Sequence, residues 1–122
     1  MQTNKFKNFK YSWNSAQVGN CYIYNKDLMI DIGMPFSAIK PYYKDIKLLL
    51  LTHQHLDHIK ISTLKKIIFE RPLLKILCCN FLVDFLKQNG IYGKNIYILQ
   101  LDKQYDLGKY LITPVYAPHD VR

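Results

Sequence analysis

The sequence contains neither a long apolar run nor an N-terminal apolar segment. No apolar run is longer than Leu48–Leu51, and crossing a bilayer needs about 20 such residues. The stretch Met1–Lys7 carries two lysines with no apolar stretch behind them, so we expect no secretory signal. The composition therefore predicts no membrane partner and a cytoplasmic location.

Cysteine is also scarce. The three cysteines are Cys21, Cys78 and Cys79. An odd number without a repeated spacing is not a disulfide framework, and no C-x-x-C zinc pair is present. We expect all three to be reduced, mostly buried and structural.

Acidic residues are few, and this imbalance sets the charge. The sequence has nine Asp and Glu residues and 17 Lys and Arg residues, which gives a net charge of +8. A basic surface attracts polyanions such as nucleic acid and nucleotides. The lysines are scattered and form no block, so the charge fits an anionic substrate or a merely soluble surface. Hydrophobic residues make up 49% of the 122 residues, enough for the core of one domain over residues 1–122.

Apolar patterning predicts alternating strands and helices between two hairpins. Strands are expected over residues 6–13, 21–24, 28–33, 46–51, 73–79 and 96–99, with a second hairpin over 105–116. Helical segments are expected from Pro35 to before Asp45, from Ser62 as N-cap to Arg71, and from Asn80 as N-cap to Asn89. This order predicts a layered α/β domain whose sheet is mixed.

The most informative segment directly follows the apolar strand ending at Leu51. His53, His55, Asp57 and His58 occur within six positions. Residues two apart in an extended segment point the same way, so both leading histidines can face one point. Imidazoles and carboxylates are preferred zinc ligands, and strand ends are where α/β sheets bind ligands. The segment predicts a zinc site with room for two ions about 3.5–4 Å apart.

The segment His53-Gln54-His55-Leu56-Asp57-His58 resembles the H-x-H-x-D-H motif of the metallo-beta-lactamase superfamily. The preceding Leu48–Thr52 resembles the lead-in strand of that family. Asp31-Ile32-Gly33 resembles its early Asp-x-Gly, and Ala117-Pro118-His119-Asp120 resembles its third metal motif. The resemblance runs from about Cys21 to the last residue. It implies a metallo-beta-lactamase-like half of an αβ/βα sandwich, with a mixed sheet and helices on one face.

The resemblance also implies a role for each residue. His53, His55 and His119 would hold a first zinc, and Asp57 and His58 a second. Asp57 would also be catalytic, orienting the attacking water or handling its proton. Asp31 would not touch the metal but would position the motif loop, although an aspartate that only caps a turn fits as well. Manganese or iron could replace zinc at such ligands.

Two features of the family have no counterpart in this sequence. Its second half carries a bridging aspartate and a final histidine beyond the third motif, and neither an aspartate nor a histidine follows Asp120 here. We therefore expect a domain truncated after the third motif, with one apolar sheet face exposed. A homodimer, another partner or a longer parent chain would cover that face.

Three functions remain open. The first is a zinc-dependent hydrolase whose metal-activated hydroxide attacks an ester or phosphodiester, with the basic charge favouring a phosphodiesterase or nuclease over a beta-lactamase. The second is a non-catalytic interaction or inhibitor protein that retains partial zinc binding. The third is a basic nucleic-acid binder whose tyrosines stack on bases, although we expect those tyrosines to pack in the core or at its edges. They are Tyr42, Tyr43, Tyr92 and Tyr97.

Overall fold

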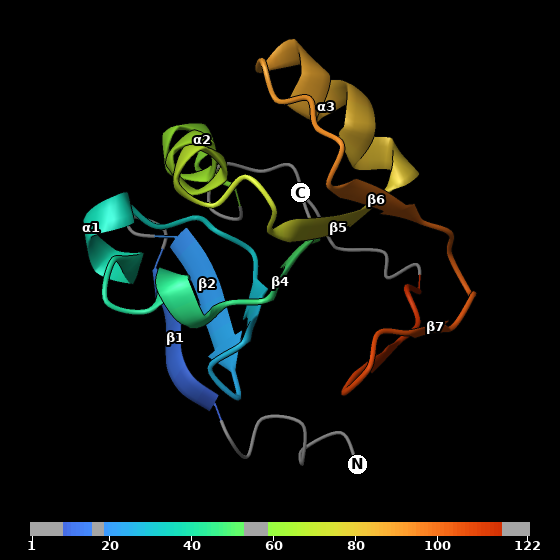
Figure 1. The fold of residues 1–122 in the computed structure, drawn as a ribbon, viewed down its shortest axis with the longest axis horizontal. Helices are drawn as coiled ribbons and strands as arrows, with labels where there is room; N and C mark the ends of the chain where they lie inside the picture. The colour runs from blue at the N-terminus through green and yellow to red at the C-terminus, as the bar shows by residue number, and fades with distance from the viewer. Residues whose placement is uncertain (1–8, 16–18, 53–58, 116–122) are drawn as a thin grey trace.

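A six-stranded mixed β-sheet forms the centre of the computed structural model, which describes residues 9–15, 19–52 and 59–115 (Figure 1). Its strands lie side by side in sequence order. They are β1 (Phe9–Ser15), β2 (Gly19–Tyr24), β3 (Leu28–Ile30), β4 (Leu48–Leu51), β5 (Lys75–Cys79) and β6 (Ile96–Leu99). The pairs β1–β2 and β2–β3 are antiparallel, and the remaining pairs are parallel. The predicted mixed sheet is confirmed.

The turn between β2 and β3 lies where turn residues predicted it. Asn25 and Lys26 have positive φ values of 53° and 69°, and Tyr24 pairs with Leu28 across the turn. The strand β3 is shorter than expected, because it ends at Ile30 rather than at residue 33. Asp31 has a φ of 64°, and a left-handed residue cannot continue an extended strand.

Helical segments connect the parallel strands and cover one face of the sheet (Figure 1). They are α1 (Phe36–Ile39), the 3-10 helix η2 (Tyr43–Asp45), α2 (Ile61–Glu70), the 3-10 helix η3 (Asn80–Leu82) and α3 (Val83–Gln88). Among the described helices, none has the length and apolar character that crossing a bilayer would require. The predicted placement of helices on one face is confirmed.

Two of the three predicted helix starts are wrong in detail. Ser62 lies inside α2, whose N-cap is the extended residue Lys60. The backbone N–H of Lys60 donates to the Ile32 carbonyl at 2.8 Å, so a contact with the residues just after β3 fixes where the helix begins. Asn80 opens the 3-10 helix η3 without capping it, and α3 begins only at Val83.

The main core lies between the sheet and the helices. Leu49 of β4 and Ile76 of β5 point into it, together with Leu64 and Ile67 of α2. All four side chains are buried, and burying each leucine or isoleucine side chain stabilises the fold by roughly 1.5–3 kcal/mol. The strand β4 is apolar on both faces, as predicted for residues 46–51.

The opposite face of the sheet is covered by a second hairpin, β7 (Tyr105–Asp106) and β8 (Leu111–Ile112). Four leucines of this face, one each from β3 to β6, are less than 10% exposed; they are Leu28, Leu48, Leu77 and Leu99. In Figure 1 the hairpin lies on the side of the sheet away from α2 and α3. The expected bare apolar face is therefore wrong for these strands, because the chain covers them with its own hairpin.

Candidate metal centre

The predicted metal ligands lie outside the described residues. These are His53, His55, Asp57, His58 and His119. The structure does describe Thr52 and Ile59, which flank the segment of residues 53–58, and Asp31, the predicted positioning residue. These three residues border the predicted site.

Asp31 holds the residue that precedes His53. Its side chain accepts the backbone N–H of Thr52 on Oδ1 at 2.8 Å and the Thr52 hydroxyl on Oδ2 at 2.6 Å. The Asp31 backbone N–H donates to the Leu50 carbonyl at 2.8 Å. The residue is only 2% exposed, and charge-assisted hydrogen bonds of this kind are the strong ones in proteins. Asp31 thus fixes the end of β4.

Ile59, the residue that follows His58, is held by Ile32, which directly follows Asp31. Ile59 forms a parallel bridge with Ile32, and Lys60 donates its N–H to the Ile32 carbonyl. Ile32 and Ile59 are both fully buried. Because Asp31 and Ile32 are consecutive, Thr52 and Ile59 are anchored at neighbouring points on the sheet edge. The predicted ligand segment begins and ends at these two anchors.

The cysteines are mostly buried, as expected from the sequence. Cys21 and Cys78 are buried, Cys79 is partly buried, and all three are free thiols. Burial, followed by the negative charge of Asp31, raises the pKa of Cys21 to about 12. Burial, followed by the neighbouring Cys79, raises the pKa of Cys78 to about 11. Neither thiol is poised to ionise, and a thiolate is the form that binds metal.

Within residues 9–15, 19–52 and 59–115, no group of three or more histidine, cysteine or acidic side chains could hold a metal ion. The metal prediction therefore depends on the segment of residues 53–58 and on His119. Of the tyrosines considered for base stacking, Tyr43 is buried as expected, whereas Tyr92 and Tyr97 are exposed.

One arrangement of charged residues was not foreseen from the sequence. The scattered lysines gave no block, yet the fold gathers Lys47, Lys75 and Lys109 with Arg71 around one cleft. Lys47 directly precedes β4, and Lys75 is the first residue of β5. A lysine near the start of each of two expected strands was the sequence feature that could have indicated this cleft. The cleft lies at the other end of β4 from Thr52.

Comparison with solved structures supports the fold. Rubredoxin oxygen:oxidoreductase from the anaerobe Desulfovibrio gigas superposes with a TM-score of 0.61 at 19% identity, over 88% of this chain and 33% of that one. The chain thus spans about a third of the length of that protein. No protein-family model matches the sequence, and no curated protein matches it. Together with the mixed sheet, the similarity supports the metallo-beta-lactamase-like half-sandwich as the fold.

Proposed function

We propose that this chain is a metal-dependent hydrolase domain of the metallo-beta-lactamase type. In this proposal, residues 1–122 form one domain in the cytoplasm. His53, His55 and His119 bind a first zinc ion, and Asp57 and His58 bind a second.

The observation that carries the proposal is the double anchor at the end of β3. Asp31 binds Thr52, and Ile32 pairs with Ile59, so both ends of the H-x-H-x-D-H segment are attached to one buried strand end. A metal site needs ligands supported by a rigid backbone, because small misplacements weaken coordination. The anchor provides that support at the edge where α/β sheets bind ligands.

Each residue of the proposed site has a separate task. Three imidazoles and one water complete a tetrahedral zinc site. When bound, zinc would lower the pKa of that water toward 7 and so supply a nucleophile at neutral pH. Asp57 would orient the water and accept its proton, and Asp31 would position His53 through Thr52 without contacting the metal. A phosphodiester is the favoured substrate, because the net charge of +8 attracts anions.

The test is metal content per chain together with mass in solution, followed by hydrolysis of bis(p-nitrophenyl) phosphate. We expect zinc to co-elute with the protein and turnover to disappear with EDTA and return with added zinc. A protein that takes up no metal under these conditions would refute the proposal. The mass also tests the proposed homodimer or other partner. A second copy would lack the same aspartate and final histidine, so only a different chain could add them.

A second candidate rests on the name of the structural neighbour, which is an oxidoreductase. The same histidines and carboxylates can bind iron, and iron rather than zinc in the purified protein would favour redox chemistry. The remaining alternative is a non-catalytic interaction or inhibitor protein with a partial zinc site. One zinc per chain, tight binding of a partner and no turnover would favour that alternative.

A further inference from the structure

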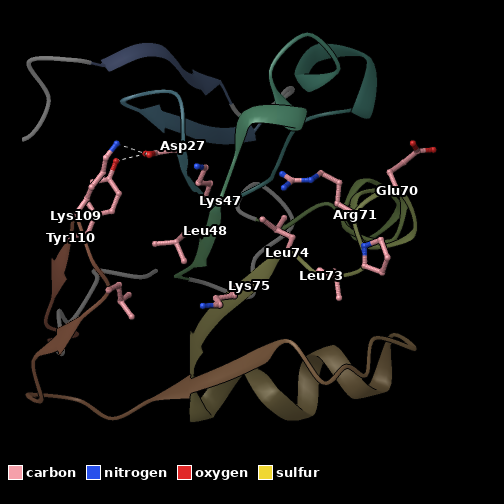
Figure 2. Close-up of a pocket in the computed structure, with 12 residues that line it drawn as sticks. Asp27, Lys47, Leu48, Glu70, Arg71, Leu73, Leu74, Lys75, Lys109 and Tyr110 are labelled. Carbon is pink, nitrogen blue, oxygen red and sulfur yellow. Dashed lines mark hydrogen bonds and ion pairs between the residues drawn. The ribbon is translucent and has the colours of Figure 1, made fainter.

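A second candidate site lies at the end of the sheet opposite to the histidine segment. A cleft of about 870 Å3 opens where β4 and β5 begin (Figure 2). Residue Leu48 pairs with Lys75 at this end of the two strands, whereas Thr52 follows the other end of β4. Roughly 13 Å of extended strand separates the two ends. We call this site the lysine cleft.

Positive charge predominates in the lysine cleft. It is lined by four cationic side chains and two carboxylates, namely Lys47, Arg71, Lys75, Lys109, Asp27 and Glu70. Asp27 already binds Lys109 Nζ at 2.8 Å and the Tyr110 hydroxyl. Glu70 accepts a hydrogen bond from the Tyr43 hydroxyl at 3.2 Å. Both carboxylates therefore have partners, and the cleft has an excess of cations.

Lys47 and Lys75 provide that excess. They come from the start of neighbouring strands, because Leu48 directly follows Lys47 and pairs with Lys75, and Leu48 lies between the two lysines in Figure 2. Neither lysine forms a salt bridge within the part of the chain that the structure describes. Both lysines line the cleft, although Lys47 also helps to lower the pKa of Asp27, so an anion bound in the cleft would be attracted by both ammonium groups.

The floor and walls of the cleft suit a ligand that also has an apolar part. Leu48 and Leu74 lie between the charged ends in Figure 2, and Leu73, which also lines the cleft, is 84% exposed. Arg71 is fixed at one end because its Nη1 donates to the Tyr43 carbonyl at 3.0 Å and to the Ile46 carbonyl. At the other end, Tyr110 is fixed by Asp27. The volume lies within the range of small-molecule sites, about 300–1,000 Å3.

We propose that the lysine cleft binds a nucleotide, with its phosphates at Lys47 and Lys75 and its base against the apolar part of the lining. A nucleotide combines a multiply charged anion with a flat, largely apolar ring, which matches cations beside an apolar floor. Lysine is a common phosphate ligand in proteins. The site is separate from the proposed metal centre and does not require metal.

Isothermal titration calorimetry with ADP, at low salt and in the presence of EDTA, tests the proposal. The EDTA removes any contribution of a metal centre to phosphate binding. We expect Lys47→Gln/Lys75→Gln to weaken ADP binding about tenfold or more, because two charge-assisted contacts are lost. The matched control is Lys87→Gln/Lys94→Gln, which removes the same charge from exposed positions outside the cleft, and its affinity should change less than about twofold.

Three outcomes would overturn the proposal. The first is the absence of measurable ADP binding to the unmodified chain. The second is equal weakening by the two double variants, which would mean a diffuse attraction to the basic surface. The third is pyrophosphate binding as tightly as ADP, since the apolar floor would then contribute nothing. Circular dichroism confirms that each variant is folded, and the two single variants serve if the double variant is not.

Discussion

The carboxylate of Asp31 binds Thr52, 21 positions later, through both of its oxygens. One bond goes to the backbone N–H and the other to the hydroxyl, so both the position and the side chain of Thr52 are fixed. The left-handed backbone at Asp31, with a φ of 64°, turns the chain at the end of β3. This pair connects an early strand to the segment that carries three of the four histidines.

Thr52→Val should destabilise the fold, because it removes the hydroxyl bond to Oδ2 of the buried Asp31. A lost hydrogen bond to a buried charged group costs about 1–3 kcal/mol. Thr52→Ser keeps the hydroxyl and should cost less than about 1 kcal/mol, the value of one methyl group. Urea unfolding measures both, and equal losses in the two variants would show that the hydroxyl bond contributes little.

His53→Ala should abolish tight zinc binding at the first site, because a tetrahedral site with three protein ligands does not tolerate the loss of one. Cys78→Ala should leave the zinc content unchanged, because this thiol is buried and its pKa is raised to about 11. Elemental analysis after gel filtration measures both. Unchanged zinc in His53→Ala would mean that the ligand assignment is wrong, and lost zinc in Cys78→Ala would overturn the structural role of the cysteine.

The contacts between Asp27 and the second hairpin should depend on pH at both extremes. Burial alone would raise the pKa of Asp27, but hydrogen bonds from Lys109 and Tyr110 and the nearby lysine charges outweigh it and hold the pKa below its usual value. Burial, followed by the bond to Asp27, raises the pKa of Tyr110 to about 12. A lowered acid pKa stabilises the fold above the unfolded value, about 4 for aspartate. A raised tyrosine pKa stabilises it below the unfolded value of about 10.

Unfolding of the unmodified chain and of Asp27→Asn should therefore differ most between about pH 4 and pH 10. The difference should shrink as the pH falls below about 4 and vanish below the lowered pKa of the folded state, where Asp27 is protonated in both states. Tyr110→Phe should lose its difference from the unmodified chain as the pH rises from about 10 to about 12. Stability curves that stay parallel over the whole range would contradict this account of the Asp27 contacts.

Thr63→Val should loosen the start of α2. The Thr63 hydroxyl donates to the Met34 carbonyl at 2.7 Å, and the residue is only 1% exposed. The valine has a similar shape but leaves that carbonyl without this donor, at a cost of about 1–3 kcal/mol. Thr63→Ser retains the donor and is the matched control. Thermal unfolding compares the stability of the two variants. A valine variant as stable as the serine variant would refute the prediction.

Much of the sheet could be predicted from the sequence because its strands are short apolar runs between turn residues. Leu48–Leu51 and Ile96–Leu99 are strands as expected, and the turn at Asn25 joins the first hairpin. The helix starts could not be predicted from Ser62 and Asn80, because neither residue caps its helix. The start of α2 follows from a backbone bond to the residues just after β3, which cap propensities do not report.

The cover over the second sheet face and the lysine cleft could not be predicted, because both depend on distant residues. Tyr105 and Ile112 pack on a leucine layer formed by four strands, and local patterning does not show which face a hairpin will cover. Likewise, Lys47 and Lys109 are far apart in the sequence yet line one cleft. The metal ligands themselves lie outside the described residues, so the predicted site stays a prediction.

The pairing of the second hairpin has a consequence for how the molecule opens. The strands β7 and β8 pair with each other in a separate two-stranded sheet, so lifting them away would break no pairing of the six-stranded sheet. The ion pair from Lys109 and the hydrogen bond from Tyr110, both to Asp27, fasten the hairpin at one end. Such an element can detach in a local, sub-global unfolding event while the rest remains folded. Amide exchange should therefore be faster in β7 and β8 than in β4 and β5, and each opening would expose a leucine layer to any partner present.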